Sequence, residues 1–339
     1  MYRVSHFGRC LTSVLTLVLF ARGAKAQEIN CQRRILPVAL RDKLNLPIQS
    51  VSAADFEARV HGKPIKVLSL APDPRPHRLV LILDTSGSVG SSTSEWPLWN
   101  LELSLARHLF EVNRQRLQMA LLFFNTQVND AVEFAKGNVA VGDKLKQIGT
   151  REFAKTHIKG RTALRDAILH GIQLLDHPTS ADAIYVLTDG GDNASHQSAS
   201  ELERRLAVTS VRLFAVLLVR EQGFGHQTPE EENGPGELAE IAQNSGGEIL
   251  TAAAWHGGSV ALSANAEAKV KSDETLNRLY QVILGDNLLE VELPFPIAKN
   301  EHWELKLSGA ARLQWKGAQI TYPTTLFSCN SEVSGAGRR

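Results

Sequence analysis

The residues best suited to chemistry are oxygen-bearing side chains placed after predicted strands. An aliphatic run from Leu79 to Leu83 ends in Asp84, and Ser86 and Ser88 follow at alternate positions. Two explanations compete for this pattern. It is either a polar turn that caps a helix or one half of an oxygen-lined metal site.

Two later segments carry the same kind of oxygen. Thr162 follows Gly160 in a tight loop before a helical pattern, and Asp189 closes the predicted strand AIYVLTD before two glycines. Carboxylates and hydroxyls are hard ligands that suit Mg²⁺, with Mn²⁺ or Ca²⁺ as alternatives. If the three loops are neighbours, they would together hold one divalent cation. The predicted ligands are Asp84, Ser86, Ser88, Thr162 and Asp189.

Plainer roles compete with this prediction at single positions. Thr162 alone would serve as the N-cap of the helix that follows it. Asp166 lies one turn after Thr162, where it would either support the site from behind the ligands or be a solvated helix carboxylate. Both alternatives stay open for each residue.

Short apolar runs alternate with helical patterns from Leu79 to Ala253, and this alternation indicates the fold class. Predicted strands cover 79–84, 116–125, 131–135, 183–189, 211–219 and 247–253, and predicted helices cover 95–113, 201–207, 236–247 and a segment opening at Thr162. Continuous aliphatic strands separated by helices predict an α/β fold, a doubly wound and mostly parallel six-stranded sheet with helices on both faces. Ligands bind beyond the carboxyl ends of such strands.

The two flanks read as antiparallel strands. Residues 51–70 predict a hairpin that turns at 61–64, and a proline-rich linker follows. Apolar and polar residues alternate in 288–295, 302–309 and 318–323, as in strands with one solvent-exposed face. Neither flank is long enough to bury a core alone, so we expect both to form one small β-sandwich. The expected divisions are 27–76, 77–284 for the α/β domain, 285–330, and a disordered tail at 331–339.

Residues 1–26 have the features of a secretory signal peptide. Two arginines precede an apolar run at 11–20, and Ala24-Lys25-Ala26 supplies small residues for cleavage. An uncleaved N-terminal anchor is the alternative. We therefore expect a soluble, exported protein, periplasmic or extracellular, without a transmembrane segment in the mature chain. Cys31 and Cys329 would remain, either as one disulfide bridge or as two thiols.

Charge and motifs argue against several function classes. The chain has 37 Lys and Arg against 36 Asp and Glu, which gives no electrostatic sign of nucleic-acid binding. A phosphoryl-transfer D-x-D motif is missing because Ser86 stands at its second position. Neither serine lies in G-x-S-x-G, and the histidines lack metal-ligand spacing. We predict that the protein is not an enzyme.

The D-x-S-x-S motif at 84–88, with Thr162 and Asp189 in the right order, resembles the von Willebrand factor type A domain and its metal-ion-dependent adhesion site. The resemblance covers about 79–253, and the lead-in VSAADFEARVHGKPIKV is similar to an exported bacterial "VWFA-related" family described from acidobacteria. It implies metal-dependent protein binding, in which the cation accepts an Asp or Glu carboxylate of a partner, for adhesion or assembly at the cell envelope. A structural envelope protein with a purely stabilising ion is the alternative, and an exported hydrolase a distant one.

One further hypothesis concerns the polar segment 223–236, predicted as a loop. One of Glu230, Glu231 and Glu232 would transiently coordinate the cation in place of a partner carboxylate. The alternative is that these three glutamates form a solvated face.

Overall fold

The computed structural model describes residues 32–43, 46–48, 50–73, 77–90, 97–220, 229–254, 260–263 and 287–328. The predicted signal peptide, both cysteines, the linker prolines Pro74 and Pro76, the predicted helix near 276–283 and the tail lie outside these residues. Among the residues described, no helix is both long and apolar enough to cross a membrane.

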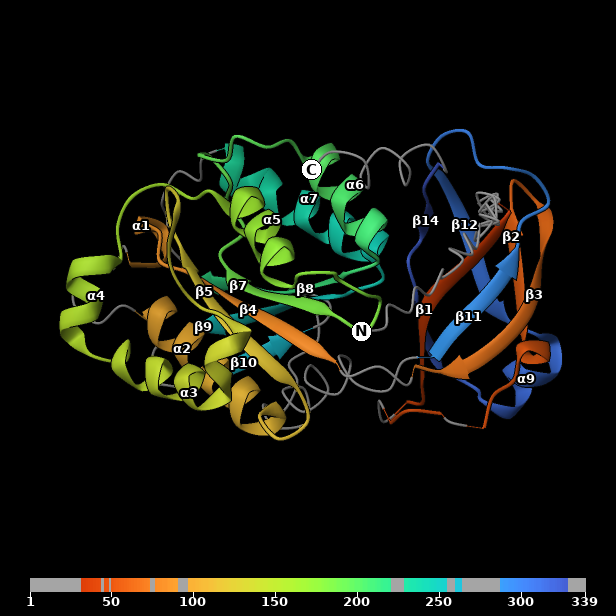
Figure 1. Ribbon diagram of the computed structural model, residues 1–339, viewed down its shortest axis with the longest axis horizontal. Coiled ribbons are helices and arrows are strands. Elements are labelled where there is room, and N and C mark those ends of the chain that lie inside the picture. Colours follow the sequence, from red (N-terminus) through yellow and green to blue (C-terminus); the bar gives the residue numbers. More distant parts are fainter. Residues whose placement is uncertain are drawn as a thin grey trace, which may run out of the picture. The chain divides into compact units, whose positions relative to one another are not determined.

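A mixed sheet of seven strands, called the α/β sheet, lies between the helices of the α/β domain (Figure 1). Its spatial order is β10-β9-β8-β7-β4-β5-β6. The strands are β4 Arg78–Asp84, β5 Gln118–Phe124, β6 Val128–Val132, β7 Ala183–Thr188, β8 Arg212–Arg220, β9 Ile249–Ala254 and β10 Val260–Ser263. The five central strands are parallel, and β6 and β10 join antiparallel at the two edges. All six predicted strands are present, and β10 is an addition that the sequence pattern did not indicate.

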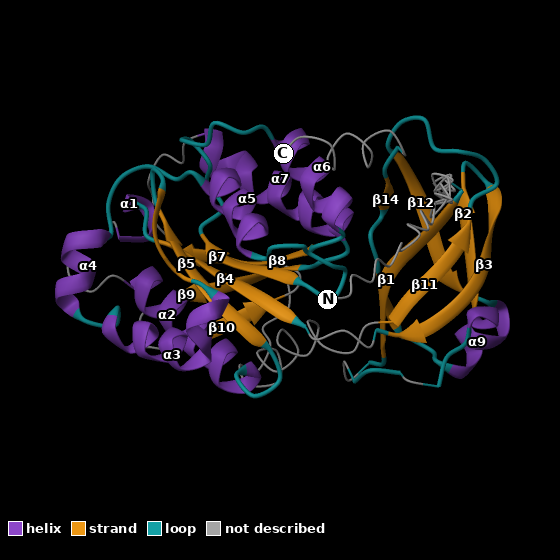
Figure 2. Ribbon diagram, in the orientation of Figure 1, coloured by secondary structure: helices purple, strands orange, loops and turns teal. Residues whose placement is uncertain are grey.

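Helices cover both faces of the α/β sheet (Figure 2). They are α1 Gly87–Gly90, α2 Pro97–Asn113, α3 Gly137–Gln147, α4 Arg151–His157, α5 Leu164–Leu174, α6 Ala199–Thr209 and α7 Pro229–Ser245, with the 3₁₀ turn η2 at Phe134–Lys136. Because strand side chains alternate between faces, Leu81 belongs to the core cluster that includes residues of α2 and α3, whereas Ile82 belongs to the cluster that includes residues of α5, α6 and α7. A strand buried on both faces has a continuous aliphatic sequence for this reason.

Several predicted boundaries were wrong. Segment 223–236 was predicted as a loop, but α7 begins at Pro229, where proline suits a first helical position because its missing N–H has no partner there anyway. Side chains at 229–232 are not described, so the hypothesis about the three glutamates is untested. The edge strand lies at Val128–Val132 rather than at 131–135. Neither α3 nor α4 was predicted.

The flanks form one antiparallel sheet, in the order β13-β1-β11-β3-β2-β12-β14. Its elements are β1 Arg33–Arg41, η1 Ala53–Asp55, β2 Phe56–Val60, β3 Lys63–Pro72, β11 Asn287–Glu292, β12 Glu301–Leu307, α9 Gly309–Gln314, β13 Gln319–Thr321 and β14 Thr325–Leu326. The predicted hairpin is confirmed: His61 and Gly62 join β2 to β3 with φ of 49° and 73°, as a tight two-residue turn requires.

This flank sheet is curled, whereas the sequence predicted a sandwich of two sheets. The long strand β3 accounts for the difference. Its first residues pair with β2, and the rest of it pairs with β11 across a register shift. One strand therefore connects both halves, and the bulge at the shift bends the sheet around a shared core that includes Val38, Phe56 and Trp303.

Candidate metal site

Three loops carry the predicted ligands: the first is 84–88, the second 159–162 and the third 189–198. Parallel strand pairing brings the first and third loops together. Strands β4 and β7 are neighbours, with Leu83 opposite Leu187, so Asp84 and Asp189 leave the same edge of the sheet. Asp84 and Ser86 are fully buried, whereas Ser88 and Asp189 are half-buried. The site is therefore reached from the side of Ser88 and Asp189.

Backbone hydrogen bonds join the second loop to the first. Gly87 N donates to Gly160 O at 3.0 Å, and Lys159 N donates to Thr85 O at 3.0 Å. Both glycines are required by this contact. A Cβ on Gly87 would lie 3.1 Å from Gly160 O, and Gly160 has a left-handed φ of +89°.

The third loop holds Thr162 from the other side. Thr162 N donates to Asn193 Oδ1 at 2.9 Å, and the amides of Asn193 and Ala194 donate to Thr162 O at 3.0 Å. Helix α5 begins at Leu164 with Ala163 as its N-cap, so Thr162 does not cap it. The hydroxyl of Thr162, a residue only 3% exposed, makes no hydrogen bond to any described residue. Its backbone is fixed while its side-chain oxygen is left for another ligand.

Hydrogen bonds also fix the oxygens of the first loop. Asp84 Oδ1 accepts from Ser86 N at 2.8 Å, and Asp84 Oδ2 accepts from Thr188 Oγ1 at 2.6 Å. Ser86 Oγ and Ser88 Oγ lie 2.9 Å apart. Adjacent oxygens in an octahedron with Mg²⁺–O bonds of ~2.05 Å are also about 2.9 Å apart. The serine pair has a spacing that suits either a hydrogen bond or two ligands of one ion.

The site concentrates negative charge in a buried position. Burial, and after it the charge of Asp189, raise the pKa of Asp84 to about 7. Burial, and after it the charge of Asp84, raise the pKa of Glu102 well above its usual value. A divalent cation would relieve this repulsion, and five hard oxygen donors suit Mg²⁺, so the residues present fit such an ion.

No three His, Cys, Asp or Glu side chains within the described ranges are arranged to hold a metal. The predicted ligand set differs from such a cluster because three of its five members are hydroxyls. The hydroxyl-rich donor set points to a hard cation and away from softer metals such as Zn²⁺.

Two residues at the site were missed by the sequence analysis. Thr188 was taken only as a strand residue, although its hydroxyl bonds Asp84. Glu102 lies on the buried face of α2, with Leu98 and Leu105 one turn away on either side. The sequence held a signal for Glu102: it is a carboxylate within the apolar stripe of the helix that follows the D-x-S-x-S loop.

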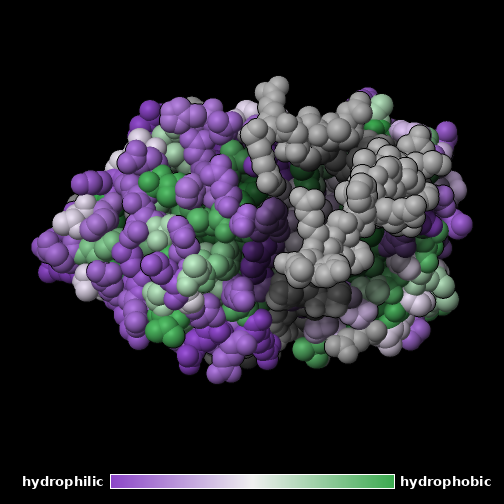
Figure 3. All heavy atoms as spheres, viewed as in Figure 1, coloured by the Kyte–Doolittle hydropathy of each residue, from purple (hydrophilic) through white to green (hydrophobic). Residues whose placement is uncertain are grey.

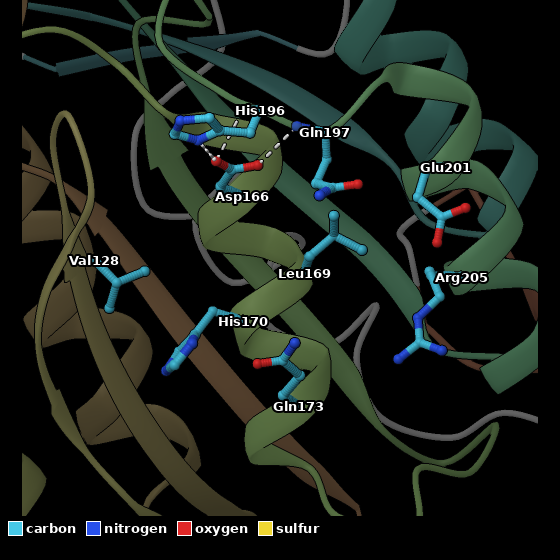
Figure 4. A pocket seen from close by; sticks show the side chains of 9 residues that line it. All are labelled: Val128, Asp166, Leu169, His170, Gln173, His196, Gln197, Glu201 and Arg205. Carbon is cyan, nitrogen blue, oxygen red and sulfur yellow. Dashed lines mark hydrogen bonds and ion pairs between the residues drawn. The ribbon is translucent and has the colours of Figure 1, made fainter. Parts of the chain in front are cut away.

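Asp166 contacts the third loop rather than a predicted ligand. Its carboxylate accepts from His196 N, His196 Nδ1 and Gln197 N at 2.9–3.0 Å. Burial opposes ionisation, but these hydrogen bonds together lower the pKa of Asp166. Figure 4 shows this contact at one end of a polar groove of about 600 Å³, which Glu201 and Arg205 of α6 also line. Asp166 therefore ties α5 to the loop that carries Asp189.

Comparison with known proteins gives a family model that matches part of the chain. A family model described as von Willebrand factor type A domain matches residues 79–191, from β4 to the third loop. No curated protein matches the chain.

Solved structures show distant likenesses. BatB from Bacteroides thetaiotaomicron has 15% identity and a TM-score of 0.40, over 61% of this chain and 96% of that one. A von Willebrand factor type A protein from Catenulispora acidiphila has 11% identity and a TM-score of 0.39, over 86% and 73%. An aerotolerance-related membrane protein from Bacteroides fragilis has 15% identity and a TM-score of 0.38, over 61% and 98%. Similarities at this level indicate no function for this chain.

Proposed function

We propose that this chain is a protein-binding module that works through one divalent cation, since residues 79–191 match a family model described as von Willebrand factor type A domain. The observation that carries the proposal is that the loop of Thr162 is hydrogen-bonded both to the loop of Asp84 and to the loop of Asp189, two carboxylates that repel each other. The proposed ion is Mg²⁺, with Mn²⁺ or Ca²⁺ as substitutes.

Each residue has a defined part in this proposal. Asp84 and Asp189 balance the charge of the ion, and Ser86, Ser88 and Thr162 contribute neutral oxygens. The bound ion would supply a coordination position for an Asp or Glu carboxylate of a partner protein. That carboxylate would enter from the side of Ser88 and Asp189, the two half-buried members of the set.

The proposed setting is the cell envelope. The pattern at residues 1–26 supports export to the periplasm or beyond, followed by adhesion or assembly without catalysis. A Cys31–Cys329 bridge belongs to the same proposal, since export favours disulfides. The alternative is a structural envelope protein in which the ion only stabilises the fold.

Isothermal titration of Mg²⁺ into three forms of the protein tests the ion site. Thr162→Val removes one hydroxyl while the backbone bonds of residue 162 remain. Thr209→Val makes the same chemical change at the last residue of α6, where the hydroxyl bonds only its own helix. We expect wild type and Thr209→Val to bind one ion and Thr162→Val to bind at least about tenfold more weakly, the effect of losing ~1.4 kcal/mol. Equal affinity in all three would overturn the ion site.

Capture of partner proteins from an envelope extract distinguishes an ion that is used for partner binding from an ion that only stabilises the fold. We expect the wild type and Thr209→Val to retain a partner protein in Mg²⁺. We expect the same partner to be lost from the wild type in EDTA and from Thr162→Val in Mg²⁺. Prey that is unaffected by EDTA, from a protein that binds Mg²⁺ normally, would instead support the structural alternative.

A further inference from the structure

A strongly basic segment precedes the loop that carries Thr162. Between residues 150 and 161 the chain has four Lys or Arg residues and one acidic residue, Glu152, although its overall net charge is only +1. The four cations, called the basic rim below, are Arg151, Lys155, Lys159 and Arg161. All four are exposed, and none forms an ion pair with a residue that the structure describes.

The backbone of the basic rim is attached directly to the candidate metal site. Lys159 N bonds Thr85 O, and Gly160 O accepts from Gly87 N, both at 3.0 Å. Gly87 stands between the two serines of the first loop. Lys159 and Arg161 therefore flank a residue that touches the ligand loop, while their side chains remain exposed.

Helix α4 carries the remaining two cations and is anchored by an aromatic cluster. The ring of Phe153 stacks on buried Trp99 at 5.8 Å and lies 6.2 Å from Phe123. Arg151 and Lys155, four residues apart and both exposed, share the solvent-facing side of the helix. Figure 1 places α4 at the same end of the sheet as α1, and that end is mainly hydrophilic in Figure 3.

We propose that the basic rim makes the module selective for acidic partners, in which the carboxylate bound at the metal site lies within a run of Asp or Glu residues. This inference rests on the proposed function. Unpaired cations within about one Debye length, ~8–10 Å, of a ligand's flanking residues attract a chain of acids and disfavour a basic one. A net charge near zero over the whole chain gives no broad field for nucleic acid, so an acidic protein segment is the better match.

Fluorescence anisotropy with two labelled decapeptides and the full chain in Mg²⁺ tests the proposal. One peptide consists of ten glutamates, and the other has a single glutamate among glycines and serines. Ten carboxylates against one give about a tenfold preference by number alone, so we expect the wild type to prefer the acidic peptide by about a hundredfold at low salt, and the excess over tenfold to shrink as salt is added.

Two charge-reversal variants locate the preference. The rim variant carries Lys155→Glu, Lys159→Glu and Arg161→Glu. The control variant carries the same charge change at three other exposed positions, Arg116→Glu, Lys136→Glu and Lys146→Glu. We expect the rim variant to keep only the tenfold that the number of carboxylates gives, without weaker Mg²⁺ binding in calorimetry, and the control variant to behave as wild type. A rim variant that keeps the whole preference of the wild type, or a control variant that loses as much of it, would overturn the proposal.

Failure of the underlying function gives a different result. Each peptide could bind as tightly in EDTA, or to Thr162→Val, as it binds to the wild type in Mg²⁺. In that case peptide binding does not use the ion, and both the proposed function and the selectivity that rests on it are overturned. If a single-stranded DNA decamer displaces the acidic peptide as effectively as unlabelled peptide does, the rim attracts any polyanion. That result would overturn selectivity for acidic protein and leave the proposed function standing.

Discussion

The backbone amide of Asp84 donates to Oε1 of Glu102 at 2.6 Å, while Oε2 of Glu102 is buried without a hydrogen-bond partner among the described residues. Both residues are 0% exposed. A buried carboxylate with an unsatisfied oxygen is costly, and such groups usually occur where function requires them. Glu102 therefore stands behind the ligand loop as a hydrogen-bond acceptor and as an ionisable group whose raised pKa favours the neutral acid.

Two substitutions separate these roles of Glu102. Glu102→Gln keeps an oxygen for Asp84 N and removes the ionisable group, so we expect unfolding in EDTA at pH 8 to cost at least as much free energy as in wild type. Glu102→Ala leaves that amide unpaired beside a cavity and should lower the free energy of unfolding by about 2–4 kcal/mol. Urea unfolding measures both. Equal losses in the two variants would contradict the acceptor role.

The raised pKa of Asp84 predicts how stability depends on pH. The folded value of about 7 exceeds the ordinary 3.8, so between them the folded state binds more protons than the unfolded state. This contribution is fully present below the unfolded pKa and is lost as pH rises through the folded pKa. In EDTA we expect the melting temperature to fall from about pH 5 to about pH 8.

Mg²⁺ and one substitution are the controls for this pH dependence. Excess Mg²⁺ should flatten the decline, because an ion that binds only the folded state stabilises it most where the carboxylates are ionised. Asp84→Asn cannot titrate, so its melting temperature in EDTA should vary less with pH. A wild-type curve that rises over this range would show that the repulsion is absent.

The sequence predicted the arrangement of the ligand loops because that arrangement follows from local patterns. Continuous apolar runs at 79–83 and 183–187 identify parallel strands buried on both faces, and residues after parallel neighbours must leave the same edge. Gly160 was likewise readable, because a tight loop before a helix favours a residue that tolerates positive φ.

What the sequence did not predict depends on tertiary contacts. A glutamate on a helix is usually solvated, so nothing local distinguishes Glu102 from an exposed acid. Helix α3 buries only Val141 and Leu145, which is too few apolar residues for a recognisable period. The curled flank sheet depends on β3 pairing with two different strands, and the sequence of a single segment does not predict its pairing partners.

Gly160 provides a test of how the second loop is positioned. Gly160→Ala would force a side chain into a left-handed conformation and place its Cβ 2.7 Å from Thr126 Oγ1. Gly137→Ala also imposes a positive φ, +74° with ψ 167°, a region almost confined to glycine, but no atom lies within 4 Å of its Cβ. We expect about 1–3 kcal/mol of destabilisation from backbone strain in either variant, with the clash against Thr126 added in Gly160→Ala. Only Gly160→Ala should weaken Mg²⁺ binding in calorimetry. Equal ion affinity in both variants would mean that the loop tolerates displacement.

The ion pair of Arg78 and Asp182 lies at the opposite end of β4 from the metal site, so it tests stability apart from ion binding. Arg78 Nη2 and Nε bond the two carboxylate oxygens of Asp182 at 2.7 and 2.9 Å, and the Asp182 side chain is only 1% exposed. Arg78→Ala leaves this buried charge with only the amide and hydroxyl of Thr179 as donors. We expect a loss of about 3 kcal/mol in urea unfolding.

The pair of Lys146 and Asp143 is the matched comparison. Its side chains are 80% and 67% exposed, and its nitrogen and oxygen lie 3.2 Å apart. Lys146→Ala should therefore change the free energy of unfolding by less than about 0.5 kcal/mol, since water already solvates both charges. Neither substitution should alter Mg²⁺ affinity, because neither residue adjoins the three ligand loops. If Arg78→Ala costs no more than Lys146→Ala, water reaches Asp182 in solution and the pair contributes as little as a surface one.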